Sequence, residues 1–201
     1  MAKLTFRYSA MNAGKSTMAM QVAHNYGEIG ANILVWKPLI DTKGEDTITS
    51  RIGINRKVDH LLSDTDSPVI LIKEVLKTTP NIDAIIVDEA QFLTPEQIEE
   101  LWTINKNANI PITCFGLLTN FRGELFPGAK RLIELADERL ELGTNSLCTC
   151  GAPAKFNARK VNGEFTIKGA EVEIDGASSN IEYVPLCGTC YYNKVYRKGK
   201  K

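Results

Sequence analysis

A glycine-lysine-serine triplet near the start of the chain constrains the fold more than any other feature. Gly14, Lys15 and Ser16 stand between an apolar stretch, residues 4–8, and an amphipathic one. In a strand-to-helix turn, small residues let backbone N–H groups surround phosphate oxygens, and the positive end of the helix faces the same oxygens. Lys15 would reach the β- and γ-phosphates, and the Ser16 hydroxyl would bind Mg²⁺. The alternative is an ordinary turn with a solvated lysine, and the strict motif has glycine where this chain has Ser9.

A second signature lies where an apolar run meets two carboxylates. Residues 84–87 are all apolar and lead directly into Asp88 and Glu89. In a nucleotide-binding fold, an acidic residue at the end of a buried strand beside the phosphate loop holds Mg²⁺, directly or through water. Of two adjacent carboxylates, one can serve the metal while the other accepts a proton from the attacking hydroxyl. The alternative is a strand that ends in a solvated acidic turn.

Strand-like and helix-like stretches alternate over the first 142 residues, which predicts an α/β fold: a P-loop parallel sheet flanked by helices. The expected strands are 4–8, 33–36, 84–87, 110–116 and 139–142, and the expected helices are 16–28, 69–76, 95–106 and 129–136. In the first helix, Met18, Val22 and Tyr26 recur at a spacing of four residues, with Ala19 and Ala23 beside them. We expect this stripe to face the sheet.

The character of the chain changes at Gly143. Two cysteine pairs follow, Cys148 with Cys150 and Cys187 with Cys190. Four thiolates in two close pairs are typical of a tetrahedral Zn²⁺ site, and such a metal supplies folding energy that a small core cannot. Two disulfides are the alternative. We therefore expect an ATP-binding domain over residues 1–143 and a small zinc-binding domain over residues 144–201.

Composition narrows the class of protein. The 24 basic residues are matched by 24 acidic ones, which argues against a dedicated duplex-DNA binder. No run approaches the roughly 20 apolar residues of a membrane helix, and Met1 to Lys3 lead straight into the first strand without a signal segment. We expect a cytoplasmic protein with no membrane or nucleic-acid partner. In that compartment, five cysteines suggest a metal or chemistry before disulfides.

Four stretches taken in order resemble the zinc-containing thymidine kinases of bacteria, phages and animal cytosol. They are residues 9–17, 88–92 and 116–128, together with the cysteine pairs, and the resemblance spans about residues 4–192. It implies transfer of the γ-phosphoryl group of ATP to the 5′-hydroxyl of thymidine, which gives dTMP. It also implies ATP, Mg²⁺ and structural Zn²⁺ as cofactors, feedback inhibition by dTTP, and a homotetramer.

The resemblance also assigns roles to residues. Glu89 would be the general base, and Ser16 and Asp88 would hold Mg²⁺. The nucleotide would contact Ser9, Ala10, Met11, Asn12, Ala13, Gly14, Lys15, Ser16, Asp88, Glu89, Ala90 and Gln91. The nucleoside would contact Met11, Phe92, Leu117, Phe121, Asn157, Gly176 and Tyr183. A lasso from about residue 157 to 183 would read thymine with backbone hydrogen bonds. Asp41 and Lys43 resemble an Asp-x-Arg pair near the phosphates, although lysine lacks the bidentate fork of arginine.

A binding protein is the alternative to an enzyme. It would be a P-loop ATPase whose zinc unit grips a protein or a single-stranded nucleic acid. The few aromatic residues after Gly143 favour the enzyme, because single-stranded nucleic acids are held on aromatic platforms in basic grooves. A kinase would consume ATP only when thymidine is present.

Overall fold

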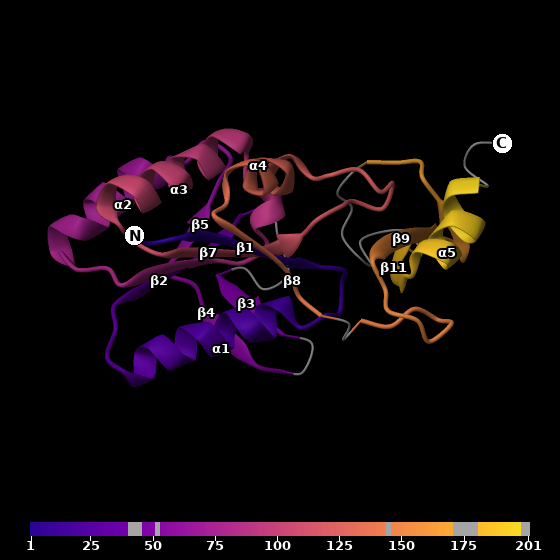
Figure 1. Ribbon diagram of the computed structural model, residues 1–201, viewed down its shortest axis with the longest axis horizontal. Coiled ribbons are helices and arrows are strands. Elements are labelled where there is room, and N and C mark those ends of the chain that lie inside the picture. Colours follow the sequence, from indigo (N-terminus) through magenta and orange to yellow (C-terminus); the bar gives the residue numbers. More distant parts are fainter. Residues whose placement is uncertain (40–45, 51–52, 144–145, 171–180, 198–201) are drawn as a thin grey trace.

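The computed structural model describes residues 1–39, 46–50, 53–143, 146–170 and 181–197. Two parts are apparent in it: a layered α/β part and a smaller part formed by the C-terminal residues (Figure 1). The predicted boundary at residue 143 falls just after the last strand of the large sheet, and the division into domains stays a prediction.

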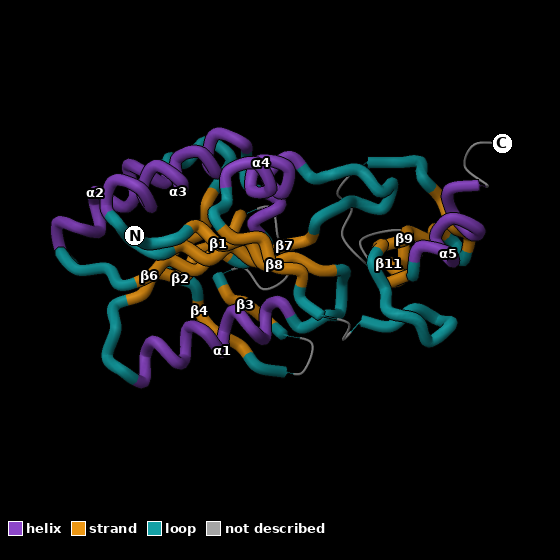
Figure 2. The backbone as a smooth tube through the Cα atoms, in the orientation of Figure 1, coloured by secondary structure: helices purple, strands orange, loops and turns teal. Residues whose placement is uncertain are grey.

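The centre of the protein is a parallel sheet of six strands (Figure 2). In spatial order the strands are β5 (His60–Leu62), β2 (Ile33–Pro38), β6 (Ala84–Val87), β7 (Ile112–Leu117), β1 (Leu4–Ser9) and β8 (Glu138–Glu141). Every neighbouring pair runs in the same direction, which confirms the predicted parallel sheet. The carboxyl ends of β1, β6 and β7 therefore meet at one edge, where ligands bind in open α/β sheets.

Helices cover both faces of the sheet (Figure 1). One face carries α1 (Lys15–Glu28), and the other carries α2 (Pro68–Thr78), α3 (Pro95–Ala108) and α4 (Pro127–Leu135). Successive side chains of a strand point to opposite faces. Ile86 accordingly belongs to the hydrophobic cluster with α1, whereas Ile85 and Val87 belong to the larger cluster on the other face. Strand β6 is fully buried for this reason.

The buried face of α1 differs from the predicted stripe. Its buried side chains include Ala19, Met20 and Ala23, while Met18 is exposed and Val22 is only partly buried. Small alanines face the sheet because the helix packs closely against it. The prediction is therefore right for Ala19 and Ala23 and wrong for Met18, which lies at the edge of the buried face.

Several short strands carried no sequence signal. Strands β3 (Thr47–Thr49) and β4 (Asn55–Lys57) form an antiparallel hairpin, and β5 extends the large sheet beyond β2. Each has only three residues, too few for an apolar period to show. Strand β2 itself continues through Lys37 to Pro38, two residues beyond the predicted end.

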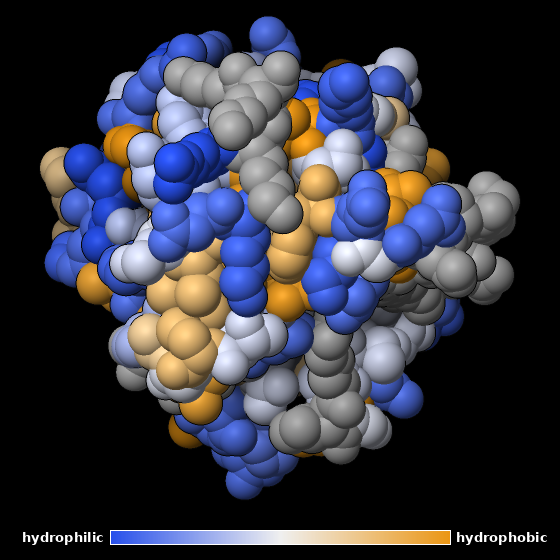
Figure 3. Space-filling model, turned by 90° about the vertical axis from the view of Figure 1, so that its right-hand side faces the viewer, coloured by the Kyte–Doolittle hydropathy of each residue, from blue (hydrophilic) through white to orange (hydrophobic). Residues whose placement is uncertain are grey.

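The C-terminal part has its own antiparallel sheet and a small core. The sheet contains β9 (Phe156–Val161), β10 (Glu164–Thr166) and β11 (Ile181–Leu186), and the helical elements α5 (Gly188–Tyr191) and η2 (Tyr192–Tyr196) follow it. The face of the molecule formed at this end mixes hydrophilic side chains with smaller hydrophobic areas (Figure 3). None of the helices in the described residues has both the length and the apolar character needed to cross a membrane.

Candidate active site

The loop between β1 and α1 has the backbone conformation that a phosphate loop requires. Gly14 has a φ of +85° and precedes the first residue of α1, and Asn12 has a φ of +65°. These left-handed residues turn the chain sharply, so that the loop closes over the end of the helix. The Lys15 side chain is buried, and its Nζ donates to the carbonyl oxygen of Ala10 at 3.1 Å. The lysine is thus held inside its own loop.

Asp88 lies at the end of β6 and is buried against this loop. Burial raises its pKa to about 7, and the charge of Glu89 acts in the same direction. A hydrogen bond with Ser16 and the charge of Lys15 oppose the shift. The structure therefore brings the phosphate loop and the acidic strand end together, although β7 lies between β1 and β6 in the sheet.

One carboxylate oxygen of Asp88 is suited to a cation. Its Oδ1 is buried, and among the described residues no donor lies within hydrogen-bond distance of it. An oxygen in this position is costly to bury unless a cation or a ligand satisfies it. Carboxylate and hydroxyl oxygens are the ligands that Mg²⁺ prefers, and Asp88 and Ser16 supply one of each. The residues present therefore fit a magnesium ion.

Glu89 is partly buried and has a left-handed backbone, with a φ of +51°. It precedes the short helix η1 (Ala90–Phe92). The Gln91 Nε2 atom donates to the Glu89 Oε2 atom at 2.6 Å, and the Gln91 Oε1 atom accepts from the backbone N–H of Leu117 at 3.0 Å. Three residues predicted for the site are therefore joined, and the buried amide of Gln91 lies between the other two.

The C-terminal part contacts the phosphate loop directly. The backbone N–H of Met11 donates to the Asn157 Oδ1 atom at 2.8 Å, and Asn157 is buried. A second link joins Tyr191, whose hydroxyl donates to the carbonyl oxygen of Phe121 at 2.8 Å. Residues far apart in the sequence are thereby fixed around one edge of the sheet.

The ring of Phe121 contacts two arginines. The guanidinium carbon of Arg159 is 4.1 Å from the centre of its ring, and that of Arg122 is 4.9 Å away. The same arginines donate to successive backbone carbonyls: Arg122 to Ile167 and Gly169, and Arg159 to Lys168 and Ala170. We call Arg122, Arg159 and Phe121 the arginine clamp. It fixes the segment 167–170, which lies within the predicted lasso.

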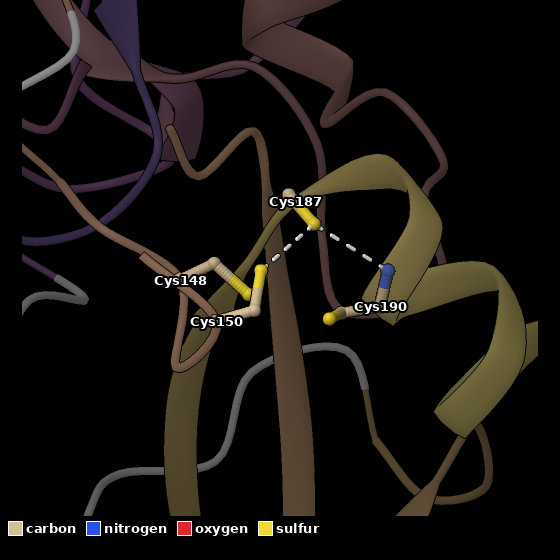
Figure 4. A group of neighbouring side chains, drawn as sticks. All are labelled: Cys148, Cys150, Cys187 and Cys190. Atoms are coloured by element: carbon tan, nitrogen blue, oxygen red, sulfur yellow. Dashed lines mark hydrogen bonds between the residues drawn. The ribbon is translucent and has the colours of Figure 1, made fainter. Parts of the chain in front are cut away.

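Four cysteine sulfurs gather in the C-terminal part (Figure 4). Cys148 and Cys150 come from one turn, Cys187 follows β11, and Cys190 lies on α5. The four sulfurs lie within 4.8 Å of one another, and those of Cys150 and Cys187 are 3.7 Å apart. All five cysteines of the chain are described, and none forms a disulfide. The structure therefore contradicts the disulfide alternative.

The geometry of the four sulfurs fits zinc. A Zn–S bond of about 2.3 Å places the sulfurs of a tetrahedral site about 3.8 Å apart. Hydrogen bonds with the other three thiols raise the pKa of Cys190 to about 12. Burial acts to raise the pKa of Cys148, but backbone N–H groups of Cys150 and Cys187 outweigh it and lower that pKa to about 6. Four thiols this close cannot all be ionised at once unless a cation such as Zn²⁺ compensates the charge of the thiolates.

The structure describes some of the other predicted ligand-binding residues and not others. Phe92 is partly buried and packs edge-on against Phe126, with ring centres 5.5 Å apart. Tyr183 lies on β11 opposite Arg159 of β9. Gly176, Asp41 and Lys43 lie outside the described residues.

Sequence reasoning missed the two arginines of the clamp. Arg159 is 2% exposed although arginine is rarely buried, and it stands in an unremarkable strand between Ala158 and Lys160. A glycine further along the chain, Gly169, is the residue that makes room for Arg159, and its φ is +111°. A Cβ atom at that position would overlap the Arg159 guanidinium.

Comparison with known proteins gives a consistent result. A family model described as "Thymidine kinase" matches residues 2–191. A protein named thymidine kinase from Legionella pneumophila (strain Lens) is 42% identical over 95% of this chain and 90% of its own length. Those from Ruegeria pomeroyi and Pasteurella multocida are each 41% identical, over 93% and 97% of this chain and 92% and 99% of their own lengths.

Proposed function

The chain belongs to the thymidine kinase family, and we propose from this premise that it transfers the γ-phosphoryl group of ATP to the 5′-hydroxyl of thymidine, giving dTMP. Family membership over nearly the whole chain carries the proposal. The arrangement at the edge of the sheet supports it, because Lys15, Asp88 and Glu89 come together there. Phosphoryl transfer needs these three kinds of group: a phosphate anchor, a metal ligand and a proton acceptor.

The phosphate loop, residues 9–16, would hold the donor nucleotide. Its backbone N–H groups and the N-terminus of α1 face the phosphates, and Lys15 would exchange its contact with Ala10 for the β- and γ-phosphate oxygens. Charge concentrated on the transferring group is thereby balanced at the moment of transfer. Ala90 would lie beside the nucleotide together with Asp88 and Glu89.

Ser16 and Asp88 would hold Mg²⁺, which would help to neutralise the negative charge of the phosphates. The buried, unsatisfied Oδ1 of Asp88 supports this assignment. A nearby cation favours the ionised carboxylate, so that binding reverses the effect of burial on the pKa of Asp88.

Glu89 would accept the proton of the thymidine 5′-hydroxyl. Its carboxylate is partly exposed, unlike that of Asp88, so that a substrate hydroxyl can reach it. Thymine would lie between Met11, Phe92, Leu117 and Phe121, with Asn157, Gly176 and Tyr183 nearby. Backbone groups of the lasso would read its Watson–Crick edge and leave polar groups unpaired against cytosine.

Cys148, Cys150, Cys187 and Cys190 would bind a structural Zn²⁺. Four thiolates complete its coordination shell and leave no position for substrate. We further propose a cytoplasmic homotetramer that is inhibited by dTTP and has no nucleic-acid partner. The tetramer and the inhibition by dTTP are implied by the resemblance to zinc-containing thymidine kinases, whereas the location and the lack of a nucleic-acid partner rest on the composition of the chain.

The replacement Glu89→Gln tests the assignment of the base. It keeps the shape of the side chain and removes the proton-accepting charge, so that turnover should fall by about 10²–10⁴-fold. Thymidine and ATP should still bind. Glu74→Gln, which alters an exposed glutamate paired with Lys77 on α2, is the matched control and should leave turnover unchanged.

Turnover is measured at saturating substrates, and thymidine binding is measured separately by calorimetry. Near-normal turnover in Glu89→Gln would assign the base elsewhere. Lost thymidine binding would make Glu89 a ligand-positioning residue instead. ATP consumption that does not depend on thymidine would contradict the kinase activity itself.

A further inference from the structure

We propose that Gln91 is a positioning residue that orients the catalytic carboxylate of Glu89 by anchoring it to the end of β7. The inference rests on the proposed role of Glu89 as general base. Gln91 joins the base to the strand end that carries Leu117, a residue predicted to line the nucleoside pocket.

The orientation of the Gln91 amide follows from the chemistry of its partners. The backbone N–H of Leu117 can only donate, so the amide oxygen must face it. The NH₂ group of Gln91 is therefore turned to the Glu89 carboxylate, which can only accept while it is ionised. Both contacts are satisfied in one orientation, and a flipped amide would lose both. The carboxylate is thus bound through Oε2 at 2.6 Å, and a hydrogen bond to an ionised acceptor is stronger than one between neutral groups.

The packing around Gln91 leaves its side chain little freedom. It is 1% exposed, and it crosses from η1 to β7 directly over Gly116. A Cβ atom on Gly116 would lie 2.6 Å from the Gln91 Oε1 atom and 3.2 Å from the Gln91 backbone nitrogen. The absence of a side chain at position 116 is therefore what allows the amide to reach the Leu117 N–H.

Glu89 needs such an anchor. Its own backbone is left-handed, it follows a buried aspartate, and its side chain is only partly buried. A carboxylate on a sharp turn has several rotamers of similar energy, and reaction requires the one that faces the hydroxyl. An amide fixed to a sheet strand selects one rotamer in advance.

The replacement Gln91→Met removes both hydrogen bonds while keeping the length and volume of the side chain. We expect kcat to fall about 10- to 100-fold, the loss usual when a partner that orients a functional group is removed. The KM for ATP should change by less than about twofold, because the replacement does not alter the binding of ATP in the ground state. Gly116→Ala should lower kcat in the same way, because it displaces the amide without altering its chemistry.

Gln97→Met is the matched control. Gln97 is also buried, and its amide donates to the carbonyl oxygens of Ser63 and Asp66, away from Glu89. Its replacement should lower the melting temperature and leave kcat unchanged. A loss of kcat equal to that of Gln91→Met would reduce the effect of Gln91 to general destabilisation and overturn the proposal.

The double variant Glu89→Gln/Gln91→Met separates this proposal from the proposed function. If Gln91 acts through Glu89, the double variant should be as slow as Glu89→Gln alone. If the kcat losses of the two single variants multiply in the double variant, the positioning role is overturned and the assignment of Glu89 as base stands. A normal kcat in Gln91→Met together with a slow Glu89→Gln would have the same consequence. Near-normal turnover in Glu89→Gln would overturn both.

Discussion

Replacing Arg159 by methionine should loosen the attachment of segment 167–170 to the rest of the protein. Arg159 contacts the Phe121 ring at 4.1 Å and donates to the carbonyl oxygens of Lys168 and Ala170. Methionine has a similar length and can still touch the ring through sulfur, but it can make neither hydrogen bond. The change therefore removes the charge and the donors while largely preserving volume.

The magnitude can be estimated from these contacts. A desolvated cation–π contact contributes about 2 kcal/mol, and a hydrogen bond from a charged donor contributes about 1.5–3 kcal/mol. Removing a buried charge also removes a desolvation cost of several kcal/mol. We expect a net loss of about 2–4 kcal/mol in the free energy of unfolding. In a protein of 201 residues, each kcal/mol lowers the melting temperature by about 2–4 °C.

Calorimetric unfolding and the KM for thymidine are the two measurements. In Arg159→Met the melting temperature should fall and the KM for thymidine should rise, because segment 167–170 lies within the lasso predicted over thymine. Arg131→Met is the control, since Arg131 forms only partly exposed ion pairs with Glu99 and Glu134, and such pairs contribute little. An unchanged melting temperature together with an unchanged thymidine KM would refute the role of the clamp.

Two further predictions concern the metal and the pH. Chelation, or the replacement Cys187→Ser, should make residues 146–197 exchange their amide hydrogens before the parallel sheet does. Protein purified without chelator should contain about one Zn²⁺ per chain, and a metal-free protein would contradict the site. Burial, with the charge of Glu89, raises the pKa of Asp88 to about 7, above the value of about 4 for a free aspartate. Without nucleotide, the stability that protonated Asp88 contributes is therefore present below about pH 4 and lost as the pH rises through about 7. The melting temperature of Asp88→Asn should rise relative to that of the unaltered protein between about pH 4 and 7, and a constant difference over that range would contradict this reasoning.

The four central strands of the parallel sheet could be predicted from the sequence because they are long or uniformly apolar, whereas the three-residue β5 at one edge could not. The run at 84–87 is buried on both faces, and the helix over residues 95–108 begins with Thr94, whose side chain and that of Gln97 form a reciprocal cap. Such signals are local, and so they can be recognised without the fold. The cysteine pairs were informative for the same reason, since the chemistry of four thiolates does not depend on the surrounding structure.

The contacts that organise the site are not local and could not be predicted. Gln91 meets Leu117 across 26 residues, and Arg122 meets Ile167 across 45. Their residue types have no distinctive pattern in the sequence, because a single buried amide or guanidinium leaves no period. The predicted nucleotide contact of Gln91 stays a prediction, and nothing in the sequence indicates that its amide joins a carboxylate to a strand end.

The hydrogen bond between Met11 and Asn157 has a thermodynamic consequence. Its donor belongs to the loop that would receive ATP, and its acceptor lies in β9, beside the predicted nucleoside pocket. The two predicted binding surfaces therefore share one contact. If ATP alters the affinity for thymidine by shifting this contact, thymidine must alter the affinity for ATP by the same factor, since a coupling free energy between two sites is reciprocal. Such a coupling would link the two binding equilibria through a single hydrogen bond and would need no movement of the sheet on which both sites are built.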